Sequence, residues 1–130
     1  MSPLHSVHFT LDDAQMLLER IRPMIDEMVS LKKKLGDLGY DVYKHSYFGG
    51  SGPNGKGSFP EEMEKLINIV KAISFFGVHI KSLDKGLIDF PHVRSNGEEV
   101  YLCWMQGEEQ ISFWHTIPEG FAGRRNVSEL

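Results

Sequence analysis

The sequence predicts one α+β domain over residues 1–130, in which an N-terminal antiparallel helical hairpin packs on a C-terminal antiparallel meander of three or four strands. Three observations support this prediction. Apolar residues recur at helical spacing over about residues 10–38 and 60–76. Over about residues 78–115 the pattern changes to short extended runs separated by glycine turns, and a tail follows over residues 116–130. The chain of 130 residues is long enough for one hydrophobic core and too short for two.

The composition is that of an ordinary globular protein. Apolar residues make up 41% of the chain and charged residues 25%. Fourteen Lys and Arg against eighteen Asp and Glu give a net charge of -4, which disfavours nucleic-acid binding. A single cysteine excludes an internal disulfide, and neither a secretory signal nor a membrane-spanning run is recognisable. We therefore expect a cytoplasmic protein that binds neither nucleic acid nor membranes.

The first predicted helix begins after Thr10, whose side chain is suited to cap it. Asp13 stands three residues later, as in a capping box. Pro23 removes one backbone donor inside the helix, so we expect a kink there. The apolar stripe is wide and consists of Ala14, Leu18, Ile21, Ile25, Met28 and Leu35, with Leu17, Met24, Leu31 and Leu38 beside it.

A glycine-rich connector occupies residues 49–59. Gly50, Gly52 and Gly55 have the spacing of the dinucleotide-binding fingerprint, and the same run nearly matches a P-loop. Both motifs need a preceding buried strand and a helix that begins within the glycine run. The next predicted helix begins only near Pro60, so we interpret the connector as a flexible linker and expect no nucleotide cofactor.

The second predicted helix has Pro60 near its first turn, acidic residues at its N-terminal end and Gly77 as its C-cap. Its buried stripe consists of Met63, Leu66, Ile67, Val70 and Ile73. Four extended runs then follow, over residues 78–82, 87–94, 99–106 and 109–115. Asn96-Gly97 suggests a type I′ turn between the second and third runs.

The register of the last hairpin depends on a two-residue type II′ turn expected at Gly107-Glu108. This turn pairs Trp104 with Ile111, Leu102 with Phe113, and Val100 with His115. The opposite face then carries Tyr101, Cys103, Ser112 and Trp114. Both faces are largely apolar, so we expect helices to cover one and a second copy of the chain to cover the other, as a homodimer. Pro91 would fall at a hydrogen-bonded position, so we also expect a bulge or break there.

Ionisable residues are dense for a small apolar sheet: Lys81, Asp84, Asp89, Arg94, Glu108, His115 and Arg124. Buried charges are costly unless they are paired, and two interpretations follow. In the favoured one, a structural network ties Arg124 to Glu108 or Asp89, and the indoles of Trp104 and Trp114 donate to nearby oxygens. In the other, the set is a ligand pocket in which Arg124 or Lys81 holds an anion and His115 donates or accepts a proton.

Histidine and cysteine spacing supports neither a metal site nor a nucleophile. No two of the six histidines have the His-x-x-x-His spacing of a helical metal site. In the predicted register Cys103 and His115 lie on opposite faces, so we interpret Cys103 as a buried, inert thiol. A cluster of His115 with Glu108 or Asp89 has no support from spacing. The remaining histidines fall in an N-terminus expected to be loose, beside the connector, or singly among the strands: His5, His8, His45, His79 and His92.

Several segments resemble a family known as domain of unknown function 2203. They are GVHIKSLDKGLIDFP at 77–91, VYLCWMQGEEQISFWH at 100–115 and GFAGR at 120–124, and FTLDDAQMLL at 9–18 is similar to the helical start of that family. The resemblance implies a small prokaryotic protein without an established activity. It assigns no role to any residue.

From the sequence we expect a non-enzymatic, self-associating module that binds a partner protein or a small ligand. The alternative is a small enzyme that acts on an anionic or carbonyl substrate through His115, an acidic residue (Glu108 or Asp89) and Arg124. No nucleophile–base pair and no cofactor motif in the sequence supports the enzyme.

Overall fold

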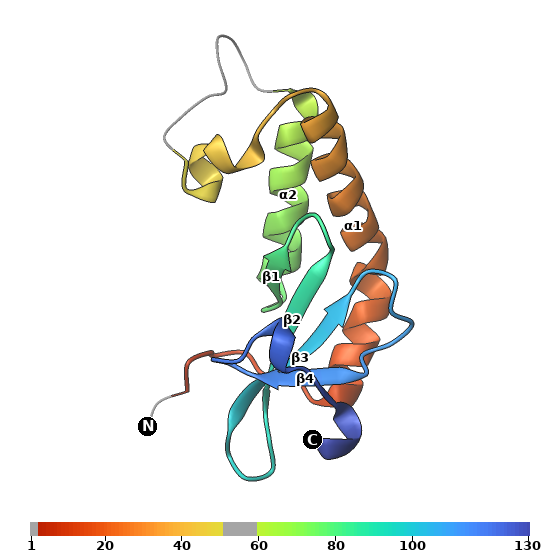
Figure 1. The fold of residues 1–130 in the computed structure, drawn as a ribbon, viewed down its shortest axis with the longest axis vertical. Coiled ribbons are helices and arrows are strands. Elements are labelled where there is room, and N and C mark those ends of the chain that lie inside the picture. The colour runs from red at the N-terminus through yellow and green to blue at the C-terminus, as the bar shows by residue number, and fades with distance from the viewer. Residues whose placement is uncertain (1–2, 51–59) are drawn as a thin grey trace.

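The computed structural model describes residues 3–50 and 60–130. Two α-helices precede an antiparallel sheet (Figure 1). The sheet has five strands in the order β1-β2-β3-β4-β5. The predicted α+β class is confirmed, but the sheet has five strands rather than three or four. Most of the connector 49–59 lies outside the described residues, so its interpretation as a linker stays a prediction. No helix in the described ranges is long and apolar enough to cross a membrane.

Helix α1 spans Leu11–Asp37, with Pro23 inside it. Thr10 is its N-cap, and the Thr10 hydroxyl accepts a hydrogen bond from the Asp13 N–H at 3.0 Å, as the capping pattern predicts. The kink expected at Pro23 stays a prediction. Leu38, which the sequence placed in the apolar stripe, follows the last helical residue and is 61% exposed. The buried stripe of α1 consists of Ala14, Leu18, Ile21, Ile25, Met28, Leu31 and Leu35.

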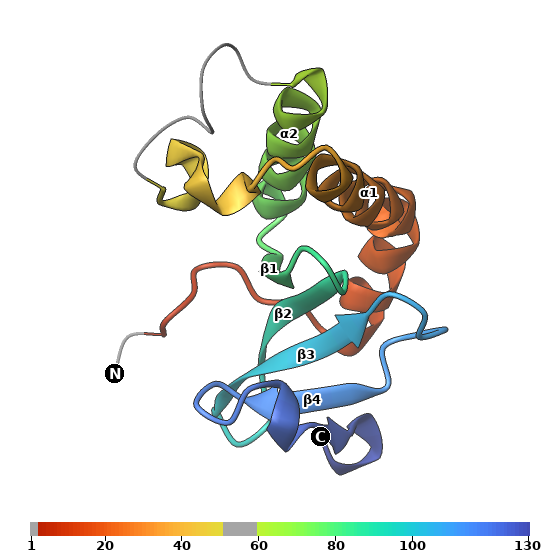
Figure 2. The same cartoon turned by 45° about the horizontal axis from the view of Figure 1, so that its top comes forward.

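Helix α2 spans Glu61–Phe75, and Gly77 (φ 91°) ends it by donating its N–H to the carbonyl of Ser74. Figures 1 and 2 show α2 beside α1 with the opposite chain direction. Two short 3-10 turns, Val42–Lys44 and Ser46–Phe48, follow α1. The buried residues of α2 are Met63, Leu66, Val70 and Ile73.

The strands are β1 (His79–Ser82), β2 (Leu87–Val93), β3 (Glu99–Met105), β4 (Phe113–Thr116) and β5 (Arg125–Asn126). Alternate residues point to opposite faces of the sheet. The first face shares one core with α1 and α2 through Ile88, Phe90, Val100, Leu102, Trp104 and Trp114. The residues between these point to the other face, called here the second face: Asp89, Pro91, Tyr101, Cys103 and His115.

The register predicted for β3 and β4 is wrong by one residue. Tyr101 lies opposite His115 and Val100 lies opposite Thr116, so His115 shares the second face with Cys103. A slip of one residue moves every side chain of a strand to the other face, which also places Trp114 in the core.

The loop before β4 is the physical reason for this difference. The Glu108 N–H donates to the Met105 carbonyl at 3.0 Å, which makes Gly107 (φ 101°) the second central residue of the turn rather than the first. The chain then runs irregularly to Phe113 because α1 holds it: Arg22 donates to the Glu109 carbonyl at 2.7 Å, and Gln15 accepts from the Ile111 N–H at 2.9 Å.

The bulge or break expected at Pro91 is also wrong, because the pairing of β2 with β3 is regular from Leu87 to Val93. The Arg94 N–H donates to the Glu98 carbonyl at 2.8 Å, so the turn has three residues rather than two. Hydrogen-bonded and non-hydrogen-bonded pairs alternate from there, and Pro91 falls in a non-hydrogen-bonded pair that needs no N–H. The irregularity of the sheet lies instead in β1, between Ile80 and Ser82.

The N-terminal segment is held in place, which corrects the expectation that His5 and His8 lie in a loose terminus. The N–H groups of Leu4 and His5 donate to the Glu99 carboxylate at 2.7 and 2.9 Å, and His8 Nε2 lies 2.6 Å from the same group. Burial raises the pKa of Glu99, but the hydrogen bonds from His8, His5 and Leu4 outweigh it and lower the pKa to about 2.

Candidate functional site

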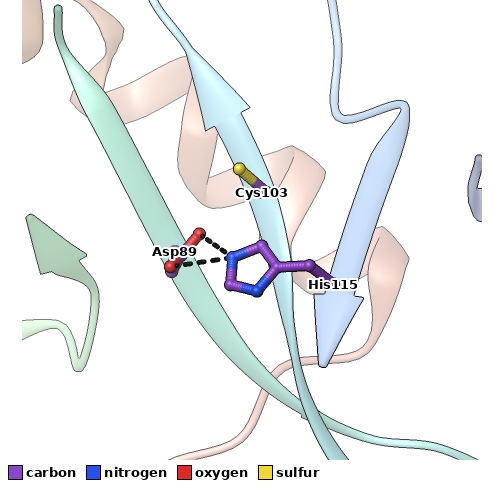
Figure 3. A group of neighbouring side chains, drawn as sticks. All are labelled: Asp89, Cys103 and His115. Atoms are coloured by element: carbon purple, nitrogen blue, oxygen red, sulfur yellow. Dashed lines mark hydrogen bonds and ion pairs between the residues drawn. The ribbon is translucent and has the colours of Figure 1, made fainter. Parts of the chain in front are cut away.

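A buried carboxylate–imidazole pair lies on the second face of the sheet. Asp89 comes from β2 and His115 from β4, and Cys103 lies between them on β3 (Figure 3). Asp89 and His115 are each 2% exposed, and Cys103 is fully buried. His115 Nε2 lies 3.1 Å from both carboxylate oxygens of Asp89. Their deep burial in a small sheet makes these ionisable side chains a candidate functional site.

The hydrogen bonds of His115 define its protonation. His115 Nδ1 lies 2.7 Å from the carbonyl oxygen of Thr116, which can only accept, so Nδ1 carries a proton. Nε2 faces the carboxylate of Asp89. A second proton, carried by Nε2, lets the imidazole donate a hydrogen bond to this carboxylate. Burial lowers the pKa of His115, but the hydrogen bonds to Asp89 and Thr116 outweigh it and raise the pKa above its usual value.

Cys103 completes the cluster as a protonated thiol. Burial and the neighbouring Asp89 carboxylate raise its pKa to about 12, and the Arg124 guanidinium lowers it only in part. A thiol in this state is a poor nucleophile, although it lies on the same face as His115. One ligand atom from each of Asp89, Cys103 and His115 lies within 4.8 Å of the other two.

A cavity of about 240 Å³ opens beside the pair. Its polar lining comes from Lys81, Asp89, Tyr101 and His115, and Ile117 and Phe121 contribute apolar surface. A larger cavity of about 440 Å³ runs along β1, but the described residues that line it include no buried ionisable pair. The smaller cavity is therefore the better candidate for a binding or catalytic site.

Lys81 brings a positive charge to the rim of this cavity. Its Nζ lies 4.7 Å from the centre of the Tyr101 ring, and in the described part of the chain it forms no ion pair. The Tyr101 hydroxyl lies 2.6 Å from His5 Nε2, and the rings of His5 and His79 are 4.4 Å apart. Burial lowers the pKa of His79, and the charges of His5 and Lys81 lower it further. His79 is therefore neutral near neutral pH, which leaves Lys81 as the main cation at the rim.

A second ion pair ties the C-terminal segment to the sheet. Arg124 Nη1 lies 3.0 Å from both carboxylate oxygens of Glu108. The Arg124 guanidinium lies 4.1 Å from the ring centre of Phe113 and 4.3 Å from that of Phe121. The Glu108 carboxylate also accepts from the Met105 N–H at 2.7 Å.

Both tryptophan indoles donate to backbone oxygens near this segment. The Trp104 indole donates to the Glu108 carbonyl at 3.0 Å, and the Trp114 indole donates to the Asn126 carbonyl at 3.1 Å.

The seven ionisable residues singled out in the sequence thus fall into separate groups. Lys81, Asp89 and His115 meet at the cavity, whereas Glu108 and Arg124 pair with each other and do not line it. The other two have exposed or partly exposed partners elsewhere: Asp84 with Lys32, and Arg94 with Glu98.

Sequence reasoning missed Tyr101, Ile117 and Phe121 as lining residues. The correct register of β4 would have placed Tyr101 beside His115. No local pattern reveals that the segment after β4 folds back over the second face.

Comparison with known proteins places the chain in a family. No curated protein and no solved structure matches it. A family model described as "Uncharacterized conserved protein (DUF2203)" matches residues 8–127 and so includes both α-helices, all five strands and the cavity. The chain therefore belongs to the DUF2203 family of uncharacterized conserved proteins.

Proposed function

We propose that this chain binds a small, singly charged anion in the cavity of about 240 Å³ on the second face. The observation that carries the proposal is the buried Asp89–His115 pair in the wall of a cavity whose rim holds Lys81. A buried ion pair contributes little net stability, so its position beside a cavity favours a role in binding.

The charges at the cavity favour an anion. Asp89 and the doubly protonated His115 neutralise each other, so Lys81 leaves the site with one net positive charge. A ligand carboxylate at the rim would neutralise this positive charge by accepting a hydrogen bond from the Lys81 ammonium group. Such a charge-assisted hydrogen bond is about twice as strong as one between neutral groups.

The size and the lining of the cavity favour a small ligand with an apolar body. Its volume is below the roughly 300–1,000 Å³ of cavities that hold drug-sized molecules. Ile117 and Phe121 provide apolar contacts opposite the polar groups. A monocarboxylic acid with a short chain or a single ring has these properties.

The hydrogen bonds of His115 favour binding over catalysis. Both of its ring nitrogens are engaged, Nδ1 with Thr116 and Nε2 with Asp89, so neither is directed at a substrate. The protonated Cys103 thiol offers no nucleophile. The enzyme that would use His115, an acidic residue and Arg124 receives less support, because Arg124 is held by Glu108.

Calorimetry with the full chain tests the proposal. The ligands are acetate, pyruvate and benzoate, with benzamide as the neutral counterpart of benzoate. We expect at least one carboxylate to bind and benzamide to give no heat of binding. Lys81→Gln should weaken carboxylate binding about tenfold or more, because a hydrogen bond to a charged group is worth about 1.5–3 kcal/mol.

Lys85→Gln is the matched control for this experiment. Lys85 is exposed in the turn that follows β1 and does not line the cavity, so its replacement should leave carboxylate binding unchanged. The proposal would be contradicted if no carboxylate gave a heat of binding, or if benzoate and benzamide bound equally well.

A further inference from the structure

We propose that Asp89, Cys103 and His115 form a binding site for one zinc ion. A carboxylate oxygen, a thiolate sulfur and an imidazole nitrogen are the usual protein ligands of zinc. The inference goes beyond anion binding and does not depend on it.

The three residues converge because of the strand register. Asp89 and Cys103 lie directly opposite each other in β2 and β3, and His115 lies on β4 opposite Tyr101, two residues from Cys103. All three point to the second face, as Figure 3 shows. Residues on three neighbouring strands are held more rigidly than residues on loops, which suits a coordination site.

The hydrogen bonds of His115 leave a position for a cation. Because Nδ1 donates to the Thr116 carbonyl, the neutral imidazole has its lone pair on Nε2. That lone pair faces both oxygens of the Asp89 carboxylate, which are acceptors as well. Two acceptors in contact require a cation between them, and either a proton or a metal ion meets this need.

The distances fit a metal ion. Zinc bonds of about 2.0–2.3 Å at tetrahedral angles place ligand atoms roughly 3.3–3.8 Å apart. His115 Nε2 lies 3.1 Å from the Asp89 oxygens, and the three ligand atoms lie within 4.8 Å of one another. Small side-chain movements therefore suffice to coordinate zinc.

The surroundings of the cluster also suit zinc. Histidine ligands of metals commonly donate their second ring N–H to a backbone carbonyl, as His115 does to Thr116. Zinc binding releases the Cys103 thiol proton and the His115 Nε2 proton to solvent, and the Asp89 carboxylate and the resulting Cys103 thiolate then balance the charge of Zn²⁺. Arg124, the nearby cation, is already neutralised by Glu108 at 3.0 Å.

The cavity of about 240 Å³ gives the ion an access route, because Asp89 and His115 line it. Three protein ligands leave one tetrahedral position for water or another small molecule. This is the coordination of catalytic rather than structural zinc sites.

Cobalt(II) titration of the chelator-treated full chain tests the inference. We expect one equivalent of cobalt to produce the visible bands of tetrahedral cobalt and a near-ultraviolet band from thiolate-to-cobalt charge transfer. Zinc should displace the cobalt and remove both signals. Cys103→Ser should abolish the charge-transfer band, and Asp89→Asn should weaken cobalt binding about tenfold or more.

His92→Gln is the control variant. His92 lies on β2 but bonds to the Phe9 carbonyl and lies outside the cluster, so its replacement should keep both cobalt signals. Because substitutions at buried positions can prevent folding, the wild-type chain provides an independent measurement. Its melting temperature should rise with zinc concentration and return to the starting value with EDTA.

The inference is overturned if cobalt produces no charge-transfer band and zinc does not change the melting temperature of the wild-type chain. Calorimetry with benzoate in EDTA separates the two proposals. Carboxylate binding that persists in EDTA, without any zinc effect, supports anion binding alone. A zinc effect without carboxylate binding supports the metal site alone.

Discussion

Tyr101 and His115 lie directly opposite each other on β3 and β4, with their ring centres 5.5 Å apart and their ring planes inclined by 60°. His115 is therefore confined on three sides, by Tyr101, by the Asp89 carboxylate and by the Thr116 carbonyl. An imidazole held in this way loses little further conformational freedom when a ligand or an ion binds.

Asp89→Ala should lower the free energy of unfolding by about 3–5 kcal/mol, because it leaves a buried imidazole without its partner. His115→Gln should be milder, since glutamine keeps a donor and much of the shape. Asp84→Ala is the control. Asp84 pairs with Lys32, but its side chain is 61% exposed, and an exposed pair contributes about 1 kcal/mol or less. Urea unfolding measures all three variants, and equal losses for Asp89→Ala and Asp84→Ala would contradict the prediction.

Arg124→Lys should destabilise the chain by about 1–2 kcal/mol, although it conserves the charge. An ammonium group cannot reproduce the planar contacts of the guanidinium with Phe113 and Phe121. Arg125→Lys should change less, because the Arg125 side chain is 48% exposed and its guanidinium lies farther from a ring centre, at 5.2 Å from that of Trp114. Melting curves of the two variants compare neighbouring positions directly, and an unchanged midpoint for Arg124→Lys would show that the ring contacts contribute nothing.

The Glu99 carboxylate should make stability depend on pH in the acid range. Its pKa is lowered in the folded chain from 4.5 to about 2, so the folded state favours the ionised form. The resulting stabilisation is present above the unfolded pKa of 4.5 and is lost as the pH falls through the folded value. Glu99→Gln removes this contribution, so its stability loss relative to wild type should be larger at pH ~6 than at pH ~3.

Glu98→Gln is the control for this experiment, since Glu98 pairs with Arg94 and its side chain is 43% exposed. Urea midpoints at the two pH values provide the comparison. A loss for Glu99→Gln that does not change with pH would contradict the hydrogen-bonded assignment of Glu99.

The homodimer stays a prediction. It was expected from an uncovered second face, but Tyr101 and His115 on that face are already buried within one chain. Leu4 remains 66% exposed in the N-terminal segment, next to His5, which contacts Tyr101. We expect a second copy to pack there, so light scattering at micromolar concentration should give twice the mass of one chain.

Leu4→Asp should shift this equilibrium to the monomer. Met16→Asp, at a position on α1 that is 72% exposed, should leave the association unchanged. A monomeric wild-type chain would contradict the homodimer and would show that segments of the same chain are enough to cover the second face.

The sequence-based predictions are accurate where structure depends on residues close together in the sequence, and wrong where it depends on residues far apart. The buried stripe of α1 was predictable because residues three and four apart share one helical face. The start of β4 was placed four residues too early, because Arg22 and Gln15 hold the preceding loop irregular across a large sequence separation.

The same distinction applies to the candidate site. Asp89 and His115 were recognised from residue type, but whether they meet depends on a single-residue register. That register is set by a turn whose glycine fits two positions equally well in the sequence. The cover provided by Ile117 and Phe121 depends on contacts between distant parts of the chain.

The hydrogen bond from the Phe9 N–H to the Pro91 carbonyl, at 2.8 Å, has a consequence for solubility. Strand β1 pairs with β2 only as far as Asp89, so the outer side of β2 beyond it could accept a strand from another molecule. Between Asp89 and Val93, Pro91 is the one residue whose backbone groups point outward. It has no N–H to donate, and Phe9 already occupies its carbonyl. The chain thereby blocks the middle of this edge against the intermolecular strand pairing through which sheet proteins aggregate.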